Sequence, residues 1–220
     1  MHKSIDNLVS IEQELKSRSN FNLKPNIIAV TKTFPTDAIK PLIDHGHLHY
    51  GENKVQEALE KWPSIKNKNK DIKLHMIGKL QTNKVKYVIP LFDYIHSLDN
   101  LRLAEKISSE QKKLEKRLKI FIQVNIGLED QKNGINKDEV FSFHKKCIED
   151  FNLDIIGLMC IPPVEGSVTS YFSSMNDLNK KIGLDHLSMG MSSDYKEAIN
   201  NGSTFVRVGS KIFGERNQIT

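Results

Sequence analysis

The 220-residue sequence predicts an α/β fold, a TIM-like (β/α)8 barrel of parallel strands with one additional N-terminal helix. Eight short apolar runs recur along the chain, helical patterns fill most of the gaps, and an amphipathic segment precedes the first run. Such alternation is typical of a parallel sheet covered by helices. Eight units favour a closed barrel, formed as a single domain over residues 1–220, and an open doubly wound sheet is the second interpretation.

The predicted strands are rich in Ile, Val, Phe, Tyr and Met, and most end in a polar residue or a glycine. Polar groups that gather where parallel strands end indicate a ligand site at one mouth of the barrel. The eight predicted strands span residues 27–32, 47–52, 73–78, 94–99, 120–126, 154–160, 186–191 and 205–210.

Helices are predicted over residues 36–45, 53–61, 83–89, 100–118, 137–150, 166–182 and 193–200. Thr36 and Asn100 are the expected N-caps. The polar stretch 66–71 is interpreted as a loop. Ten residues follow Ser210, too few for a long eighth helix, so we expect the amphipathic helix at residues 2–18 to cover the seam that this leaves.

The composition, with 38% hydrophobic and 27% charged residues, is that of a soluble protein with a core and excludes disorder along the whole chain. No uncharged apolar run reaches the roughly 18 residues that cross a bilayer. Residues 1–10 contain Lys3 and Asp6 and lack the apolar core of a signal peptide. Cys147 and Cys160 are too few for a disulfide scaffold, so we expect a cytoplasmic protein.

A formal net charge of +5 is compatible with a nucleic-acid partner, an acidic small molecule or no specific partner. The lysines are spread along the chain, and no aromatic residues interleave with them as a stacking platform for bases requires. We therefore interpret the basic segments as solvated faces and expect no nucleic-acid and no membrane partner.

Lys32 ends the first predicted strand and faces the same way as Ile28 and Val30. A lysine on the interior side of a barrel strand is desolvated, which favours the neutral, nucleophilic amine. The alternative is a lysine at a strand end that extends into solvent.

Phe205, Arg207 and Gly209 share one face of the last predicted strand, while two valines share the other. The valines should meet the helices, so Arg207 should point into the barrel, where it needs a partner of low or negative charge. Gly209, Ser210 and Ser192 offer backbone N–H groups and hydroxyls after strands seven and eight, where barrels commonly hold a phosphate. The alternative there is simple turn chemistry.

His47 and His49 lie on one side of a predicted strand, but no third ligand has suitable local spacing. We expect packing or hydrogen bonding from them, and no metal site. His75 is interpreted as a core or site-surrounding histidine, and Cys160 as a buried small apolar residue, with a reactive thiol near the site as the alternative.

Several sequence blocks, in order and over nearly the whole chain, resemble the pyridoxal phosphate homeostasis proteins, single-domain relatives of the alanine racemase N-terminal barrel. The blocks are Ala29-Val30-Thr31-Lys32-Thr33, Gly51-Glu52-Asn53, His75-Met76-Ile77-Gly78-Lys79-Leu80-Gln81-Thr82-Asn83-Lys84, Gly157-Leu158-Met159, Leu187-Ser188-Met189-Gly190-Met191-Ser192, Val206-Arg207-Val208-Gly209 and Ile212-Phe213-Gly214.

The resemblance implies that pyridoxal 5′-phosphate is bound as an internal aldimine on Lys32, with Arg207 facing the pyridine nitrogen. The other cofactor-binding residues that it implies contact the phosphate or surround the ring, and they are Ser192, Gly209, Ser210, Met189, Asn53, His75 and Ser97. It implies no catalytic residue. An arginine opposite the ring nitrogen keeps that nitrogen unprotonated and makes the ring a weaker electron sink.

The favoured function is therefore vitamin B6 homeostasis by a non-catalytic carrier of the cofactor. The expected partners are pyridoxal phosphate, amino acids and, in transient contacts, cofactor-dependent apo-enzymes. We expect the carrier to be a monomer. The alternative is an amino-acid racemase, which needs a second acid–base group. In related racemases this group is a tyrosine from a second domain, which we expect to be absent here, and Tyr50, Tyr171 and Tyr195 offer no obvious replacement. A cofactor-free Schiff-base lyase is a further alternative.

Overall fold

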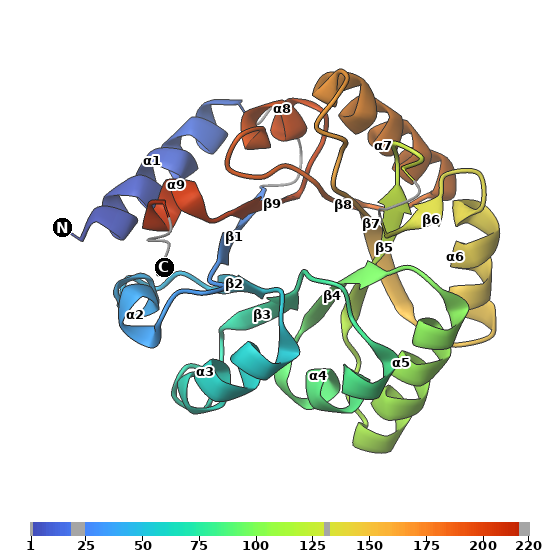
Figure 1. The fold of residues 1–220 in the computed structure, drawn as a ribbon, viewed down its shortest axis with the longest axis horizontal. Helices are drawn as coiled ribbons and strands as arrows, with labels where there is room; N and C mark the ends of the chain where they lie inside the picture. Colours follow the sequence, from blue (N-terminus) through green and yellow to red (C-terminus); the bar gives the residue numbers. More distant parts are fainter. Residues whose placement is uncertain (1, 19–24, 130–132, 216–220) are drawn as a thin grey trace.

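Eight parallel strands circle the middle of the molecule and helices surround them (Figure 1). This computed structural model describes residues 2–18, 25–129 and 133–215. Strands pair in the order β4-β3-β2-β1-β9-β8-β7-β5, and pairing of β4 with β5 closes the ring. The predicted closed (β/α)8 barrel is confirmed, and the open doubly wound sheet is wrong.

Every predicted strand overlaps an observed strand, although most observed strands end one to three residues earlier. The strands are β1 Asn26–Val30, β2 His49–Glu52, β3 Lys73–Met76, β4 Tyr94–Leu98, β5 Lys119–Asn125, β6 Ile135–Asn136, β7 Asp154–Cys160, β8 His186–Ser188 and β9 Phe205–Val208. The short β6, which pairs with β5, was not predicted, because a two-residue strand has no detectable periodicity.

The helices are α1 Lys3–Arg18, α2 Thr36–Asp44, α3 Val55–Lys68, α4 Val85–Leu91, α5 Leu101–Leu114, α6 Val140–Glu149, α7 Val168–Ile182, α8 Tyr195–Asn200 and α9 Ser210–Phe213, and the 3-10 helix η1 spans Thr82–Lys84. No helix in the described ranges is long and apolar enough to cross a membrane.

Several details of the helix prediction are wrong. Helix α5 ends at Leu114 and not at residue 118, because Glu115 is left-handed, and α4 continues through Pro90 to Leu91. Pro35 is the N-cap of α2, so Thr36 is already helical and caps nothing. Helix α3 continues past Pro63 to Lys68, where the sequence predicted the start of a loop, because buried Trp62 and Ile65 hold its second half against the barrel. The cap at Asn100 is confirmed, since its side chain accepts a hydrogen bond from the backbone of Leu103.

The barrel has two apolar layers, one between strands and helices and one inside the ring of strands. The inner layer consists of Ile28, Tyr94, Phe121, Met159 and Phe205, all buried. Because side chains alternate along a strand, the inward position of Phe205 places Arg207 on the interior side too. Lys32, two residues past the end of β1, lines the cavity at this end of the barrel together with Val30. The predicted parity of the first and last strands is confirmed.

Helix α1 closes the outer wall beside α2, α8 and α9, and it lies next to α9 in Figure 1. Asn7 Nδ2 donates to the Ile212 carbonyl at 3.0 Å, and Glu14 accepts from the Tyr195 hydroxyl and pairs with Lys196 Nζ at 3.0 Å. The predicted role of the first helix in covering the seam is confirmed.

Candidate functional site

A cavity of about 770 Å³ opens where the strands end, within the size range of small-molecule sites. Residues from six strand ends line it, so the carboxyl ends of the parallel strands build the site together. The lining residues are Val30, Lys32, Phe34, Asn53, Ile77, Gly78, Ile161, Met191, Ser192, Ser193, Arg207, Gly209, Ser210, Lys211, Gly214 and Glu215. Six of the nine residues predicted for the cofactor site are among them.

Lys32 lies two residues beyond β1 and is half-buried in the cavity wall. The next residue, Thr33, has a backbone φ of 68°, in the left-handed region that β-branched residues disfavour. The turn that aims Lys32 into the cavity is therefore strained, and neighbouring groups must hold it.

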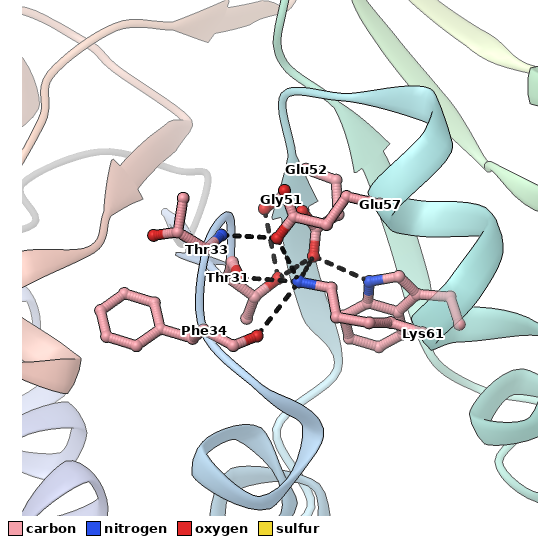
Figure 2. Close-up of polar contacts among 8 residues, drawn as sticks. Thr31, Thr33, Phe34, Gly51, Glu52, Glu57 and Lys61 are labelled. Carbon is pink, nitrogen blue, oxygen red and sulfur yellow. Dashed lines mark hydrogen bonds and ion pairs between the residues drawn. The ribbon is translucent and has the colours of Figure 1, made fainter. Parts of the chain in front are cut away.

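The carboxylate of Glu52, fully buried at the end of β2, anchors this turn from behind (Figure 2). Its Oε1 accepts from the Thr31 hydroxyl at 2.7 Å and from Trp62 Nε1 at 3.0 Å, and it pairs with Lys61 Nζ at 2.7 Å. A buried carboxylate needs such partners, because an uncompensated charge in the interior is costly.

Lys61 connects Glu52 to the turn itself. Its ammonium group donates to the carbonyls of Thr31 and Phe34 at 2.9 and 3.2 Å. It also pairs with Glu57 at 2.8 Å, and Glu57 accepts from the Thr33 backbone N–H at 2.5 Å (Figure 2). We call Glu52, Glu57 and Lys61 the turn clamp, because together they bond the residues on both sides of Lys32.

Arg207 lies on β9, the strand that pairs with β1, and is 5% exposed. Its Nη1 donates to the Ser188 carbonyl at 2.8 Å and to the Ser188 hydroxyl at 2.7 Å, and its Nη2 donates to the Cys160 carbonyl at 2.9 Å. Burial lowers the pKa of this guanidinium. The predicted partner of low charge is confirmed, since all three acceptors are neutral.

The segments after β8 and β9 present donors to one side of the cavity. Ser192 Oγ accepts from the backbone N–H of Gly209 at 3.2 Å and of Lys211 at 3.5 Å, which brings the two loops together. The described lining residues carry three cationic side chains, Lys32, Arg207 and Lys211, against the carboxylate of Glu215. This balance favours an anionic ligand.

Asn53 follows β2 at the cavity wall, and its Oδ1 is buried without a hydrogen-bond partner among the described residues. Gly78 lies so close that a Cβ there would come within 2.2 Å of the Asn53 carbonyl, so only glycine fits. A buried amide oxygen without a partner is costly, and a ligand in the cavity would relieve that cost.

Three residues predicted for the site, His75, Ser97 and Met189, do not line this cavity. His75 and Ser97 are buried in the strands, and the Met189 side chain packs in the outer core. Met191 lines the cavity instead, because β8 ends at Ser188 and the turn at Gly190, with φ of 91°, ends the regular alternation of side chains.

The other candidate residues have structural contacts. Burial raises the pKa of the Cys160 thiol to about 12, which argues against a reactive thiol. His47 Nε2 lies 2.9 Å from the His49 carbonyl, and His49 Nδ1 lies 3.0 Å from His75 Nε2. The predicted hydrogen bonding of the histidines is confirmed. Sequence reasoning missed His96, whose partners are 21 and 92 residues away.

Comparison with known proteins identifies a matching family model and relatives that cover most of the chain. Residues 7–217 match the family model described as alanine racemase, N-terminal domain. A pyridoxal phosphate homeostasis protein of Aquifex aeolicus is 38% identical over 199 residues, 86% of each chain. The human protein of that name is 35% identical over 216 residues, 88% of this chain and 78% of its own.

Solved structures of similar fold come from the same kinds of protein. PipY of Synechococcus elongatus with PLP bound has a TM-score of 0.85 and 31% identity, covering 96% of this chain and 100% of its own. An alanine racemase of Clostridium difficile shares the fold, with a TM-score of 0.76 and 15% identity over 58% of its own length. The chain therefore belongs to the alanine racemase N-terminal domain family and, within it, to the pyridoxal phosphate homeostasis proteins.

Proposed function

We propose that this protein binds pyridoxal 5′-phosphate through Lys32 and acts in vitamin B6 homeostasis without efficient catalysis. The observation that supports this most directly is the shared cavity of Lys32, Arg207 and the donors at Ser192 and Gly209. A PLP-bound relative of nearly the same fold supports the choice of ligand.

The residues present fit this cofactor. An amine, a cluster of backbone and hydroxyl donors, an excess of positive charge and the unpartnered Asn53 oxygen line one space of suitable size. We propose that Lys32 holds the aldehyde carbon, that Ser192, Gly209 and Ser210 hold the phosphate, and that Asn53 and Arg207 contact the ring. His75, Ser97 and Met189 would act on the site only indirectly.

Pyridoxal phosphate, when bound, supplies an aldehyde for reversible amine chemistry and a ring that withdraws electrons. Lys32 provides the amine, and the turn clamp fixes its direction. Arg207 presents a cation to the place proposed for the ring nitrogen, and this disfavours a second proton there. The ring then withdraws electrons weakly, which favours storage of the cofactor over carbanion chemistry.

The cavity also lacks a second acid–base group of the kind a racemase uses. The described lining residues include no tyrosine, histidine or cysteine. Tyr50 is buried in the outer core and Tyr195 bonds to α1. We propose that residues 1–220 act as one cofactor-binding unit in the cytoplasm, as a monomer that exchanges cofactor with free amino acids or apo-enzymes.

Borohydride reduction followed by peptide mass spectrometry tests this proposal. The unaltered protein loaded with pyridoxal phosphate should give a phosphopyridoxyl group on Lys32, and Lys32→Ala should give none. The exposed Lys86→Ala serves as a control that keeps the adduct. An adduct that persists on another lysine in Lys32→Ala would contradict the assignment, and racemase turnover at ordinary enzyme rates would contradict the carrier role.

A further inference from the structure

A chain of three histidines runs through the barrel interior and ends on Arg207. His49 Nδ1 lies 3.0 Å from His75 Nε2, and His75 Nδ1 lies 2.9 Å from His96 Nε2. His96 Nδ1 lies 2.8 Å from the Ser188 hydroxyl, which accepts from Arg207 Nη1 at 2.7 Å. These contacts join four strands, β2, β3, β4 and β8, to β9.

The imidazole rings of His75 and His96 stack on aromatic side chains, which hold them in place. His75 stacks on Tyr94 with ring centroids 4.2 Å apart, and His96 stacks on Phe121 at 4.4 Å. His75 and His96 are completely buried. His49 is half-buried and lines a second cavity, of about 390 Å³, at the end of the barrel where the strands begin.

The hydrogen bond between Arg207 and Ser188 determines which ring nitrogen of each histidine carries the hydrogen. Arginine only donates, so the Ser188 oxygen accepts from Arg207, and the Ser188 hydrogen needs an acceptor. Among the described residues the acceptor in reach is His96 Nδ1. His96 then carries its hydrogen on Nε2 and donates to His75, which in turn donates from Nε2 to His49.

We propose that His96 and His75 are positioning residues for Arg207, held with His49 as three neutral Nε2–H tautomers that bond in one direction away from the guanidinium. Each dipole in this series presents its negative end to Arg207. The series thereby stabilises a buried cation that forms no ion pair with a carboxylate among the described residues, and it fixes the Ser188 hydroxyl that accepts from the guanidinium.

Electrostatics favours the same direction. In the reverse order His96 would donate to Ser188, every dipole would present its positive end to Arg207, and the Ser188 hydrogen would lack a described acceptor. Burial also lowers the pKa of His75 and His96 well below the usual range, which keeps both rings neutral beside the cation. Because arginine does not release its proton, the three histidines conduct no proton and act only through their dipoles on the guanidinium.

A consequence for the cofactor rests on the proposed function. A guanidinium fixed by this series keeps one orientation toward the place of the pyridine nitrogen. The histidines would then affect cofactor affinity without contacting the cofactor or taking part in the covalent link at Lys32.

Nitrogen-15 NMR of the histidine rings in the cofactor-free protein tests the proposal directly. At pH 7, long-range proton–nitrogen correlations should assign the neutral Nε2–H tautomer to His49, His75 and His96. A neutral Nδ1–H tautomer at His75 or His96 would overturn the proposal. This measurement uses the unaltered protein and does not depend on whether pyridoxal phosphate binds.

Substitutions at His96 separate positioning from packing. His96→Phe keeps a ring on Phe121 but removes both nitrogens, including the one that bonds the Ser188 hydroxyl. The Arg207 side-chain N–H signals should therefore broaden, and cofactor affinity should fall about tenfold, as expected for losing one hydrogen bond. The Lys32 adduct should remain. His96→Gln, which can accept and donate, should restore most of the affinity.

His186→Gln is the matched control, because this interior imidazole lies within hydrogen-bond distance of Thr204 and does not belong to the series of three histidines. It should leave the Arg207 signals and the affinity unchanged. Unchanged signals and affinity in His96→Phe would overturn the proposal, and if that variant does not fold, the tautomers of the unaltered protein decide. Absence of any Lys32 adduct in the unaltered protein would count against the proposed function alone.

Discussion

Arg207 and Lys32 place two nitrogen-bearing side chains at one barrel mouth, and each has a different kind of support. Arg207 is held by neutral acceptors, two carbonyls and one hydroxyl. Lys32 is carried on a turn whose neighbours are ion-paired. Neutral support leaves the positive field of Arg207 directed at the cavity. The carboxylates of the turn clamp pair with Lys61 behind the turn, and Glu52 Oε2 has no hydrogen-bond partner among the described residues.

Replacing Arg207 should weaken cofactor binding without removing the covalent link. Arg207→Ala deletes the cation proposed to face the ring, so affinity measured by absorbance titration should fall about tenfold or more. Borohydride should still give an adduct on Lys32. Arg102→Ala, at an exposed site on α5, serves as the control. Loss of the adduct in Arg207→Ala would contradict the role assigned to this residue.

The strained backbone at Thr33 gives a prediction on stability. A left-handed conformation costs an L-residue roughly 1–2 kcal/mol that glycine avoids. Thr33→Gly should therefore raise the free energy of unfolding by about 1 kcal/mol in urea titrations, after the extra chain entropy of glycine is counted. Thr33→Ala keeps a Cβ and should show no such gain. A clear loss of stability in Thr33→Gly would show that the threonine side chain supports the turn.

At the scale of elements, the turn clamp joins three parts of the chain: the β1–α2 turn, the end of β2 and the first half of α3. The Glu52–Lys61 pair is largely buried, with side-chain exposures of 0% and 11%. Removing one partner of such a pair leaves a buried charge without compensation.

Lys61→Met should therefore lower the free energy of unfolding by about 3–5 kcal/mol. Adding Glu52→Gln removes the stranded charge, so the double variant should be more stable than Lys61→Met alone. Lys40→Met breaks an exposed pair with Asp44 and should cost less than about 1 kcal/mol. Equal losses from Lys61→Met and Lys40→Met in urea unfolding would show that the buried pair contributes no more than a surface pair.

The elements also show what the sequence could predict and what it could not. Period-two alternation correctly placed Ile28, Lys32 and Arg207 on the interior side, because the side-chain direction in a strand is a local property. The resemblance, and not local alternation, implied a site role for Met189, whose side chain packs in the outer core next to the glycine turn that follows β8. The histidine chain depends on the register between strands, as in the pairing of Gly51 with His75, and a single sequence does not encode register locally.

On the scale of the whole molecule, the interior contains several imidazoles that the fold keeps neutral. Burial lowers the pKa of His47 and His49 to about 4, and it lowers that of His75 and His96 well below the usual value. In the unfolded chain these groups titrate near 6.5. Below that pH the unfolded state binds more protons than the native state, so acid favours unfolding.

Stability should accordingly be constant above pH 6.5 with respect to these groups and should fall as the pH drops from about 6.5 to about 4. Each buried histidine adds a slope of up to about 1.4 kcal/mol per pH unit. Urea unfolding at several pH values measures this slope, and His96→Phe should reduce it by about one histidine's share. Equal slopes in the two proteins would show that His96 is protonated in the native state.

Within the ring of strands β1 pairs with β9, and α1 packs against α9, so segments from opposite ends of the described chain become neighbours. During synthesis, β1 emerges from the ribosome long before β9 and spends that interval with an unpaired edge. Contacts of such high sequence separation slow folding, and an exposed edge invites association with other chains. Chaperone demand on the nascent polypeptide should therefore be greatest just before residues 205–213 emerge.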